Sequence, residues 1–110
     1  NSGPAGAINS CAKDLASWMR FQLAEGRLDG RRVAPAAAVE ILRTPQNLQR
    51  VSPFARALNP STHLAAYGLG FGLADYQGRL KVEHTGGLNG MYSIVAMIPE
   101  EELGVAVITN

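Results

Sequence analysis

Apolar residues near the start of the chain recur with the spacing of an α-helix. The positions on this stripe are Leu15, Trp18, Met19 and Gln22-Leu23. Asn9 or Ser10 is suited to cap the N-terminus of such a helix, and Gly26 is suited to the position just after its end. The pattern therefore predicts a helix from about residue 10 to residue 25.

A second, shorter helix is expected after a turn at residues 28–31. Pro35 suits its first position, and Val39 and Leu42 supply its apolar face. Thr44-Pro45 ends it, because the residue before a proline avoids the α region. Residues 46–64 contain prolines and no regular apolar period, so we expect a long loop with a single helical turn that forms a lid or rim.

From Tyr67 onward the apolar period changes to two, which is typical of β-strands. The alternation predicts strands over residues 67–73, 80–83, 92–98 and 103–109, with turns at Gln77-Gly78 and at residues 99–102. One face of the first strand carries only glycine, so a neighbouring element can approach it closely. The chain is therefore predicted to be α+β, with two helices followed by a four-stranded antiparallel meander.

A polar, glycine-bearing segment joins the second and third predicted strands. It reads His84-Thr85-Gly86-Gly87-Leu88-Asn89-Gly90. Its glycines let a ligand approach the backbone, while His84 and Thr85 add a titratable ring and a hydroxyl, a combination suited to holding an anion or a polarised carbonyl. A phosphate-binding loop fits less well, because the segment lacks the lysine of a P-loop and precedes a strand pattern rather than a helix.

Composition narrows the classes of function. The chain has 110 residues, of which 46% are hydrophobic, and a net charge of +1, so we expect one folded domain and no nucleic-acid-binding surface. Its single cysteine, Cys11, excludes an intrachain disulfide framework. Cys11, His63 and His84 are too widely separated in the sequence to indicate a zinc site. No apolar run reaches the length of a transmembrane segment.

Four segments, in order, resemble the serine β-lactamase-like family, which includes class C β-lactamases, penicillin-binding proteins such as D-alanyl-D-alanine carboxypeptidases, and related esterases. Residues 5–16 are similar to its helix start of glycine, serine and Asp-Leu-Ala, and residues 67–71 to its Tyr-Gly-Leu-Gly-Trp strand. Residues 84–87 are similar to its third active-site motif, Lys-Thr-Gly or His-x-Gly. Residues 99–110 resemble the strand before its final helix.

The resemblance implies the C-terminal part of a β-lactamase/transpeptidase-like α/β sandwich, with residues 1–110 as a fragment of one hydrolase domain whose N-terminal portion is missing. A serine outside the chain would attack a β-lactam, peptide or ester carbonyl and form an acyl-enzyme. The tyrosine motif of the family, Tyr-x-Asn, does not occur in the sequence. The segment alone is therefore expected to be inactive.

The same resemblance assigns roles to four residues. Gly87 would supply a backbone N–H to an oxyanion hole, and His84 would act on the substrate electrostatically where the family often has lysine, so both are candidate catalytic residues. Thr85 would contact a carboxylate or carbonyl of the substrate, and Gly86 would lie beside it at the substrate site with a mainly geometric role. The competing interpretation is that these residues only shape a strand and a turn.

Ser10-Cys11-Ala12-Lys13 matches the nucleophile motif Ser-x-x-Lys literally. At a helix start, Lys13 would lie beside Ser10, and desolvation would lower the lysine pKa enough for base chemistry. Ser10 also matches the helix-capping serine of the family, and the missing tyrosine motif favours that role. The alternative to an enzyme is a non-catalytic binding module on the same scaffold.

The resemblance implies no metal and no organic cofactor. The expected partners are a small-molecule or peptide substrate and the N-terminal portion of the same protein, and exposed sheet surface is also expected to favour self-association. The family suggests a periplasmic, secreted or cell-envelope location.

Overall fold

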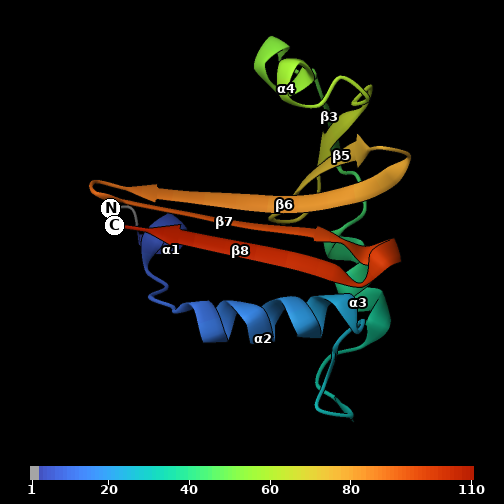
Figure 1. The fold of residues 1–110 in the computed structure, drawn as a ribbon. Helices are drawn as coiled ribbons and strands as arrows, with labels where there is room; N and C mark the ends of the chain where they lie inside the picture. The colour runs from blue at the N-terminus through green and yellow to red at the C-terminus, as the bar shows by residue number, and fades with distance from the viewer. Residues whose placement is uncertain (1–2) are drawn as a thin grey trace.

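Helix α2 (Ala12–Leu23) lies against one face of a six-stranded antiparallel sheet in the computed structural model, which describes residues 3–110 (Figure 1). The strands are β3 (Asn47–Gln49), β4 (Ala65–Tyr67), β5 (Gly72–Tyr76), β6 (Arg79–Leu88), β7 (Met91–Ile98) and β8 (Leu103–Thr109). Their order in the sheet follows the chain. The predicted α+β class is confirmed, but the predicted four-stranded meander is wrong because the sheet has six strands.

The first predicted strand, residues 67–73, is interrupted by a tight turn between β4 and β5. The N–H of Gly68 donates to the carbonyl of Phe71 at 2.8 Å, and Gly70 has φ +92°, which glycine adopts without strain. The expected close approach does occur. A Cβ on Gly68 would lie 2.3 Å from the carbonyl oxygen of Leu42, at the end of helix α3 (Ala36–Leu42). The glycines therefore reflect a turn packed on α3.

The region predicted as a loop, residues 46–64, contains a strand and a helix. β3 pairs with β4 and forms one edge of the sheet, and α4 (Pro53–Leu58) stands off the sheet beyond it (Figure 1). The Ser52 hydroxyl caps α4 by accepting the N–H of Ala55 at 3.0 Å. The expected helical turn is thus present as α4. The loop prediction is wrong at β3. Its sequence, Asn-Leu-Gln, has no apolar alternation that would indicate a strand, and it becomes one by pairing with β4.

Helix α2 begins later than predicted, after the short helix α1 (Gly3–Gly6). Cys11 occupies the N-cap position and its side chain forms no capping hydrogen bond. The expected caps, Asn9 and Ser10, are therefore wrong.

The C-terminus of α2 is a Schellman motif. The N–H of Gly26 donates to the carbonyl of Phe21 at 2.9 Å, and the N–H of Glu25 donates to that of Gln22 at 3.3 Å. Glu25, with φ 52°, occupies the position that was predicted for Gly26. Gly26 is still required, because a Cβ there would lie 2.5 Å from the carbonyl oxygen of Ala34.

Two tight hairpin turns lie at the positions predicted from the sequence. Asp29-Gly30 joins β1 (Arg27–Leu28) to β2 (Arg31–Arg32), and Gln77-Gly78 joins β5 to β6. In both turns the two central residues have positive φ, 48° and 78° in the first and 51° and 79° in the second, as a type I′ turn requires. A 3₁₀ helix, η1 (Pro99–Glu101), forms the predicted turn between β7 and β8. These turn predictions are confirmed.

The core lies between α2 and the sheet. Its buried members are Met19, Ala66, Phe71, Leu73, Val82 and Met97. Leu73, Val82 and Met97 are directly paired across neighbouring strands, so their side chains share the face that packs on α2. Gly104 is paired with Met97 on the same face, where a Cβ would lie 3.1 Å from the Met19 sulfur. We call this the core face of the sheet.

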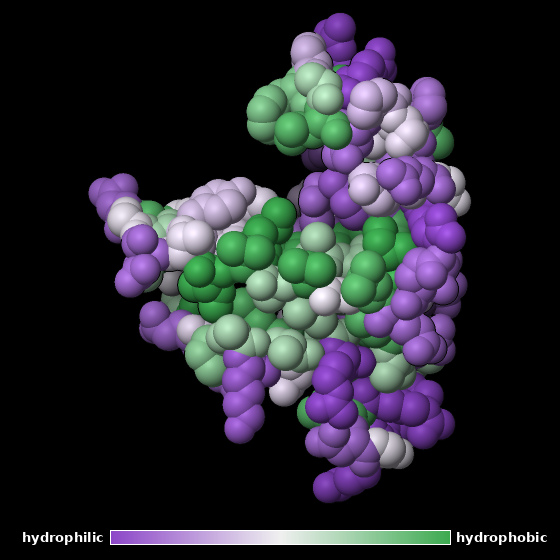
Figure 2. All heavy atoms as spheres, viewed as in Figure 1, coloured by the Kyte–Doolittle hydropathy of each residue, from purple (hydrophilic) through white to green (hydrophobic). Residues whose placement is uncertain are grey.

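The opposite face carries apolar side chains that solvent can reach. Leu103, Val105 and Val107 alternate with the core-face residues of β8 and are about half exposed. Figure 2 shows hydrophobic side chains gathered over the sheet between α2 and α4. Among the described residues, none of the helices has both the length and the apolar character needed to cross a membrane.

Candidate functional site

The segment His84–Leu88 is strand, not loop. It forms the second half of β6 and pairs with β7 from His84↔Val95 to Leu88↔Met91. The turn follows at Asn89-Gly90, where Gly90 has φ +83°. The predicted strand over residues 80–83 is therefore too short, because β6 continues to Leu88 and only Asn89-Gly90 of the polar segment forms the turn into β7.

The second half of β6 has an open edge. β5 pairs with β6 only as far as Gly72↔Glu83, and beyond Glu83 no strand among residues 3–110 pairs with β6 on that side. Figure 1 shows β6 and β7 extending together past the end of β5. The backbone along this edge is therefore available to a ligand.

The register identifies which backbone groups face that edge. The two-residue hairpin closes with Tyr76↔Arg79, so the N–H and C=O groups of Arg79, and of every second residue after it, point toward β5. Thr85 and Gly87 continue this series past the end of β5. Their N–H and C=O groups therefore point to the open edge, while His84 and Gly86 direct theirs to β7.

The side chains of His84 and Thr85 flank this edge from two sides. His84 is two residues from Val82 and lies on the core face, whereas Thr85 lies on the opposite face. Both residues are exposed. Within residues 3–110 the imidazole of His84 forms neither a hydrogen bond nor an ion pair, so the fold gives this ring no structural partner.

The two central glycines differ in what the fold requires. A Cβ on Gly86 would lie 2.7 Å from the hydroxyl oxygen of Ser93 on β7, so the Ser93 side chain would have to move to admit it. At Gly87 the nearest atom to such a Cβ is Cδ2 of Tyr92 at 3.8 Å, an ordinary contact, and the backbone has no positive φ. Neither space nor backbone conformation therefore demands glycine at position 87.

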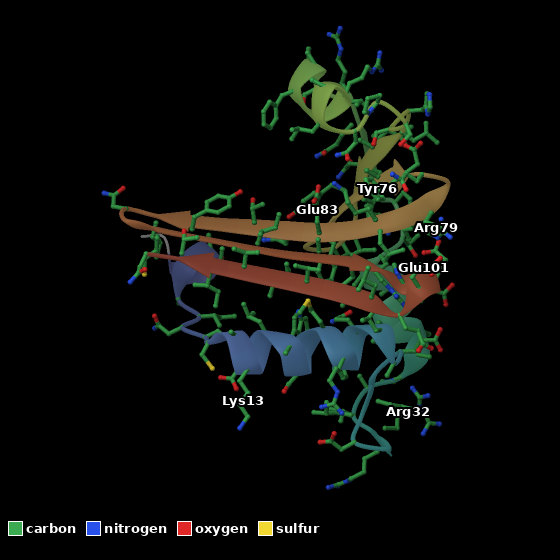
Figure 3. The ribbon with its side chains drawn as sticks, in the orientation of Figure 1. Lys13, Arg32, Tyr76, Arg79, Glu83 and Glu101 are labelled. Atoms are coloured by element: carbon green, nitrogen blue, oxygen red, sulfur yellow. The ribbon has the colours of Figure 1, made fainter. Side chains whose placement is uncertain are left out.

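Ser10 and Lys13 do not form a catalytic pair in this structure. Ser10 precedes α2, and its hydroxyl donates to the neighbouring carbonyl of Cys11 at 3.5 Å. Lys13, in the first turn of α2, is exposed and points away from the sheet (Figure 3). The described residues show no hydrogen bond between these two side chains. The Ser-x-x-Lys spacing therefore does not bring the hydroxyl and the amine together here.

An ion pair adjoins the site and was not predicted. Lys81 Nζ lies 2.9 Å from a carboxylate oxygen of Glu83, and by strand alternation both side chains share a face with Thr85. They line a hollow of about 280 Å³ beside α4, together with Asn59 and Thr62. The alternation Lys81, Glu83, Thr85 was visible in the sequence, and extending the strand to Leu88 would have placed the three on one face.

Asp75, on β5, forms hydrogen bonds with the segment that connects α4 to β4. Its carboxylate accepts the N–H of Leu64 at 2.6 Å and the N–H of His63 at 2.8 Å, and it lies 3.4 Å from His63 Nδ1. The hydroxyl of Thr62 donates to the Asp75 carbonyl at 2.8 Å. The hydrogen bonds from Leu64 and His63 hold the pKa of Asp75 below its ordinary value. Asp75 thus holds the segment that follows α4, residues 62–64, against β5.

The comparison with protein families gives one finding. The family model described as Beta-lactamase matches residues 1–110, the whole of the chain. The chain belongs to the β-lactamase family. The resemblance drawn from its four sequence segments is thereby confirmed. Searches of curated proteins and of solved structures found no match. Membership gives this chain the scaffold of a serine hydrolase family, on which the open edge of β6 is the candidate site.

Proposed function

We propose that this β-lactamase-family chain forms the substrate-facing wall of a serine hydrolase that acts on a β-lactam, peptide or ester carbonyl. One observation carries the proposal. The second half of β6 presents the unpaired backbone of Thr85 and Gly87 at an open edge, between the side chains of His84 and Thr85. Such an edge suits an extended substrate whose carbonyl must meet a fixed N–H donor.

In the proposed reaction a serine hydroxyl outside this chain attacks the substrate carbonyl carbon. Its proton passes to a neighbouring lysine or tyrosine, the C–N or C–O bond then breaks, and the leaving group takes up that proton. Water releases the acyl group from the serine by the reverse proton transfers. The Gly87 N–H would stabilise the oxyanion of each tetrahedral intermediate, a contribution of about 3 kcal/mol for one such donor.

The other three residues have supporting roles in this proposal. Thr85 binds a carboxylate or carbonyl of the substrate, and His84 interacts with it electrostatically from the other face of the strand. Gly86 has a geometric role, because its missing side chain leaves room for the Ser93 hydroxyl on β7. At Gly87 the fold leaves room for a Cβ, so the role proposed for this residue rests on its N–H and not on the absence of a side chain.

The first test is covalent labelling of the intact protein that contains this chain, with a fluorescent penicillin and with a fluorophosphonate. An adduct mapped to a serine outside residues 1–110 supports the proposal. An adduct on Ser10 contradicts the placement of the nucleophile. The absence of any adduct on folded protein would favour the alternative, a non-catalytic module that binds extended peptides along the same edge.

A substitution at Gly87 tests the oxyanion role directly. Gly87→Pro removes an N–H that points to the open edge and breaks no bond to β7, so the strand can accommodate it. We expect kcat/KM of the intact enzyme to fall by about 100- to 1,000-fold. Gly87→Ala is the matched control, because it keeps the N–H and has room for its Cβ. Equal losses in the two variants would show that the N–H has no catalytic role.

A further inference from the structure

A second hollow lies at the opposite end of the sheet from β8. It encloses about 490 Å³ between β3, α4 and the chain that enters β4. The residues that matter here are Leu48, Arg50, Val51, Arg56, His63 and Leu64, and we call this hollow the arginine groove. We propose that the arginine groove binds a small amphipathic anion, a carboxylate or phosphate group carried on an apolar body.

The charge of the groove favours an anion. Arg50 follows β3 and Arg56 lies on α4, so the two arginines line the groove from different elements. In the part of the chain that the structure describes, neither forms an ion pair or a side-chain hydrogen bond. No aspartate or glutamate of residues 3–110 lines the groove. The nearest acid to His63 is Asp75, whose carboxylate is already engaged by backbone N–H groups.

Guanidinium groups suit this ligand for a geometric reason. The planar fork of arginine matches the two oxygens of a carboxylate or phosphate, and charge-assisted hydrogen bonds of this type are stronger than neutral ones. The chain as a whole has a net charge of only +1, so two unengaged arginines at one groove are a local excess of positive charge. An anionic group would therefore find two donors that no residue of the described chain occupies.

The apolar lining favours a ligand with a hydrophobic body. Leu48 is 87% exposed and Leu64 is 70% exposed, and Val51 lies beside them in the groove. The volume falls within the range of about 300–1,000 Å³ that small-molecule sites occupy. A ligand that covered these leucines while its anionic end met Arg50 and Arg56 would satisfy both parts of the lining.

The arginine groove does not reach the open edge of β6, although Arg50 and Val51 also line the neighbouring hollow that contains Lys81 and Glu83. β4 and β5 lie between β3 and β6 in the sheet. Leu48 is paired through Ala66 and Leu73 with Val82, so it lies on the core face, while Thr85 lies on the opposite face. His84–Gly87 do not line the groove. This inference therefore does not depend on the hydrolase proposal, and the two can fail independently.

The test is isothermal titration of the full chain with 4-phenylbutyrate, phenyl phosphate and the neutral 4-phenylbutanol. We expect both anions to bind and the alcohol to bind at least tenfold more weakly, with affinity falling as salt is added. Arg50→Gln and Arg56→Gln should each weaken the anions about tenfold. The matched control is Arg31→Gln, an exposed arginine in the β1–β2 hairpin, which should change nothing.

Three outcomes would overturn the proposal. The first is that 4-phenylbutanol binds as tightly as 4-phenylbutyrate. The second is that Arg31→Gln weakens binding as much as Arg50→Gln. The third is that none of the three probes binds to protein whose circular dichroism spectrum is native. A fourth measurement separates a free ligand from a membrane surface. Sedimentation with phosphatidylglycerol vesicles, dependent on Arg50 but without any titration signal from the free anions, would assign the arginines to lipid binding instead.

Discussion

The packing of Gly68 on helix α3 can be tested by a single methyl group. In Gly68→Ala the new Cβ would lie 2.3 Å from the carbonyl oxygen of Leu42, whereas ordinary contacts begin near 3.4 Å. The clash is with backbone, so about 1 Å of movement must come from α3 or from the turn itself. Overpacking of this kind costs about 1–3 kcal/mol.

The same carbonyl makes the movement more costly. It accepts the N–H of Leu69 at 3.1 Å, so displacing it weakens a hydrogen bond worth about 1 kcal/mol. Alanine recovers about 0.5 kcal/mol by restricting the unfolded chain. We therefore expect the free energy of unfolding to fall by about 2–3 kcal/mol and Tm to fall by roughly 10 °C.

Urea denaturation followed by far-ultraviolet circular dichroism measures this loss. Gly72→Ala is the matched control in the same glycine-rich stretch, since its Cβ would meet Glu83 at 3.5 Å, a normal contact, and its φ is not positive. We expect the control to lie within about 0.5 kcal/mol of the parent chain. If Gly68→Ala were as stable as Gly72→Ala, the close packing of the turn on α3 would be refuted.

Four further predictions follow from particular contacts. Gln22 is fully buried and its amide atoms have no hydrogen-bond partner among residues 3–110, so Gln22→Met should raise the free energy of unfolding by about 1 kcal/mol; a loss measured by urea denaturation would show that the amide is satisfied. Ser52→Ala should cost about 1 kcal/mol because it removes the α4 cap, whereas Ser10→Ala should leave thermal stability unchanged; equal effects would contradict the cap assignment. Because folding lowers the pKa of Asp75, the carboxylate stabilises the fold above pH 3.8, and this contribution is lost as the pH falls through the lower folded pKa. The urea midpoints of Asp75→Asn and of the parent chain should therefore differ at pH 7 and converge at low pH. A difference that stayed constant with pH would be evidence against the anchoring role of Asp75. β8 forms an apolar edge, so sedimentation velocity should show concentration-dependent self-association that Val105→Lys reduces; a monomer at every concentration would argue against it.

Local signals predicted the parts of the fold that local residues determine. The stripe around Met19 predicted α2, and Asp29-Gly30 and Gln77-Gly78 predicted turns, because their backbone conformations follow from glycine and its neighbour. The caps of α2 were not predicted because Cys11 and Glu25, which lie at these positions, are not the residue types that favour them. At its C-terminus the Schellman motif places Glu25, not Gly26, directly after the cap.

Pairing between distant residues determined what the sequence did not predict. β3 has three residues and no period, and it is a strand only because β4 lies beside it. The run from Tyr67 to Leu73 alternates as a strand does, yet its glycines serve a turn whose tight packing on Leu42 involves a helix more than 20 residues earlier in the chain. Such contacts depend on the assembled sheet, so propensity alone does not reveal them.

The candidate site shows the same division between chemistry and geometry. Residue types alone identified His84, Thr85 and the two glycines, and attributed them to a loop. In the structure they form a strand that is ten residues long, beside a partner, β5, that has only five. This difference in length leaves the Thr85 and Gly87 backbone groups unpaired. If β5 continued to the end of β6, the same residues would be an ordinary buried ladder, and no ligand could reach the Gly87 N–H.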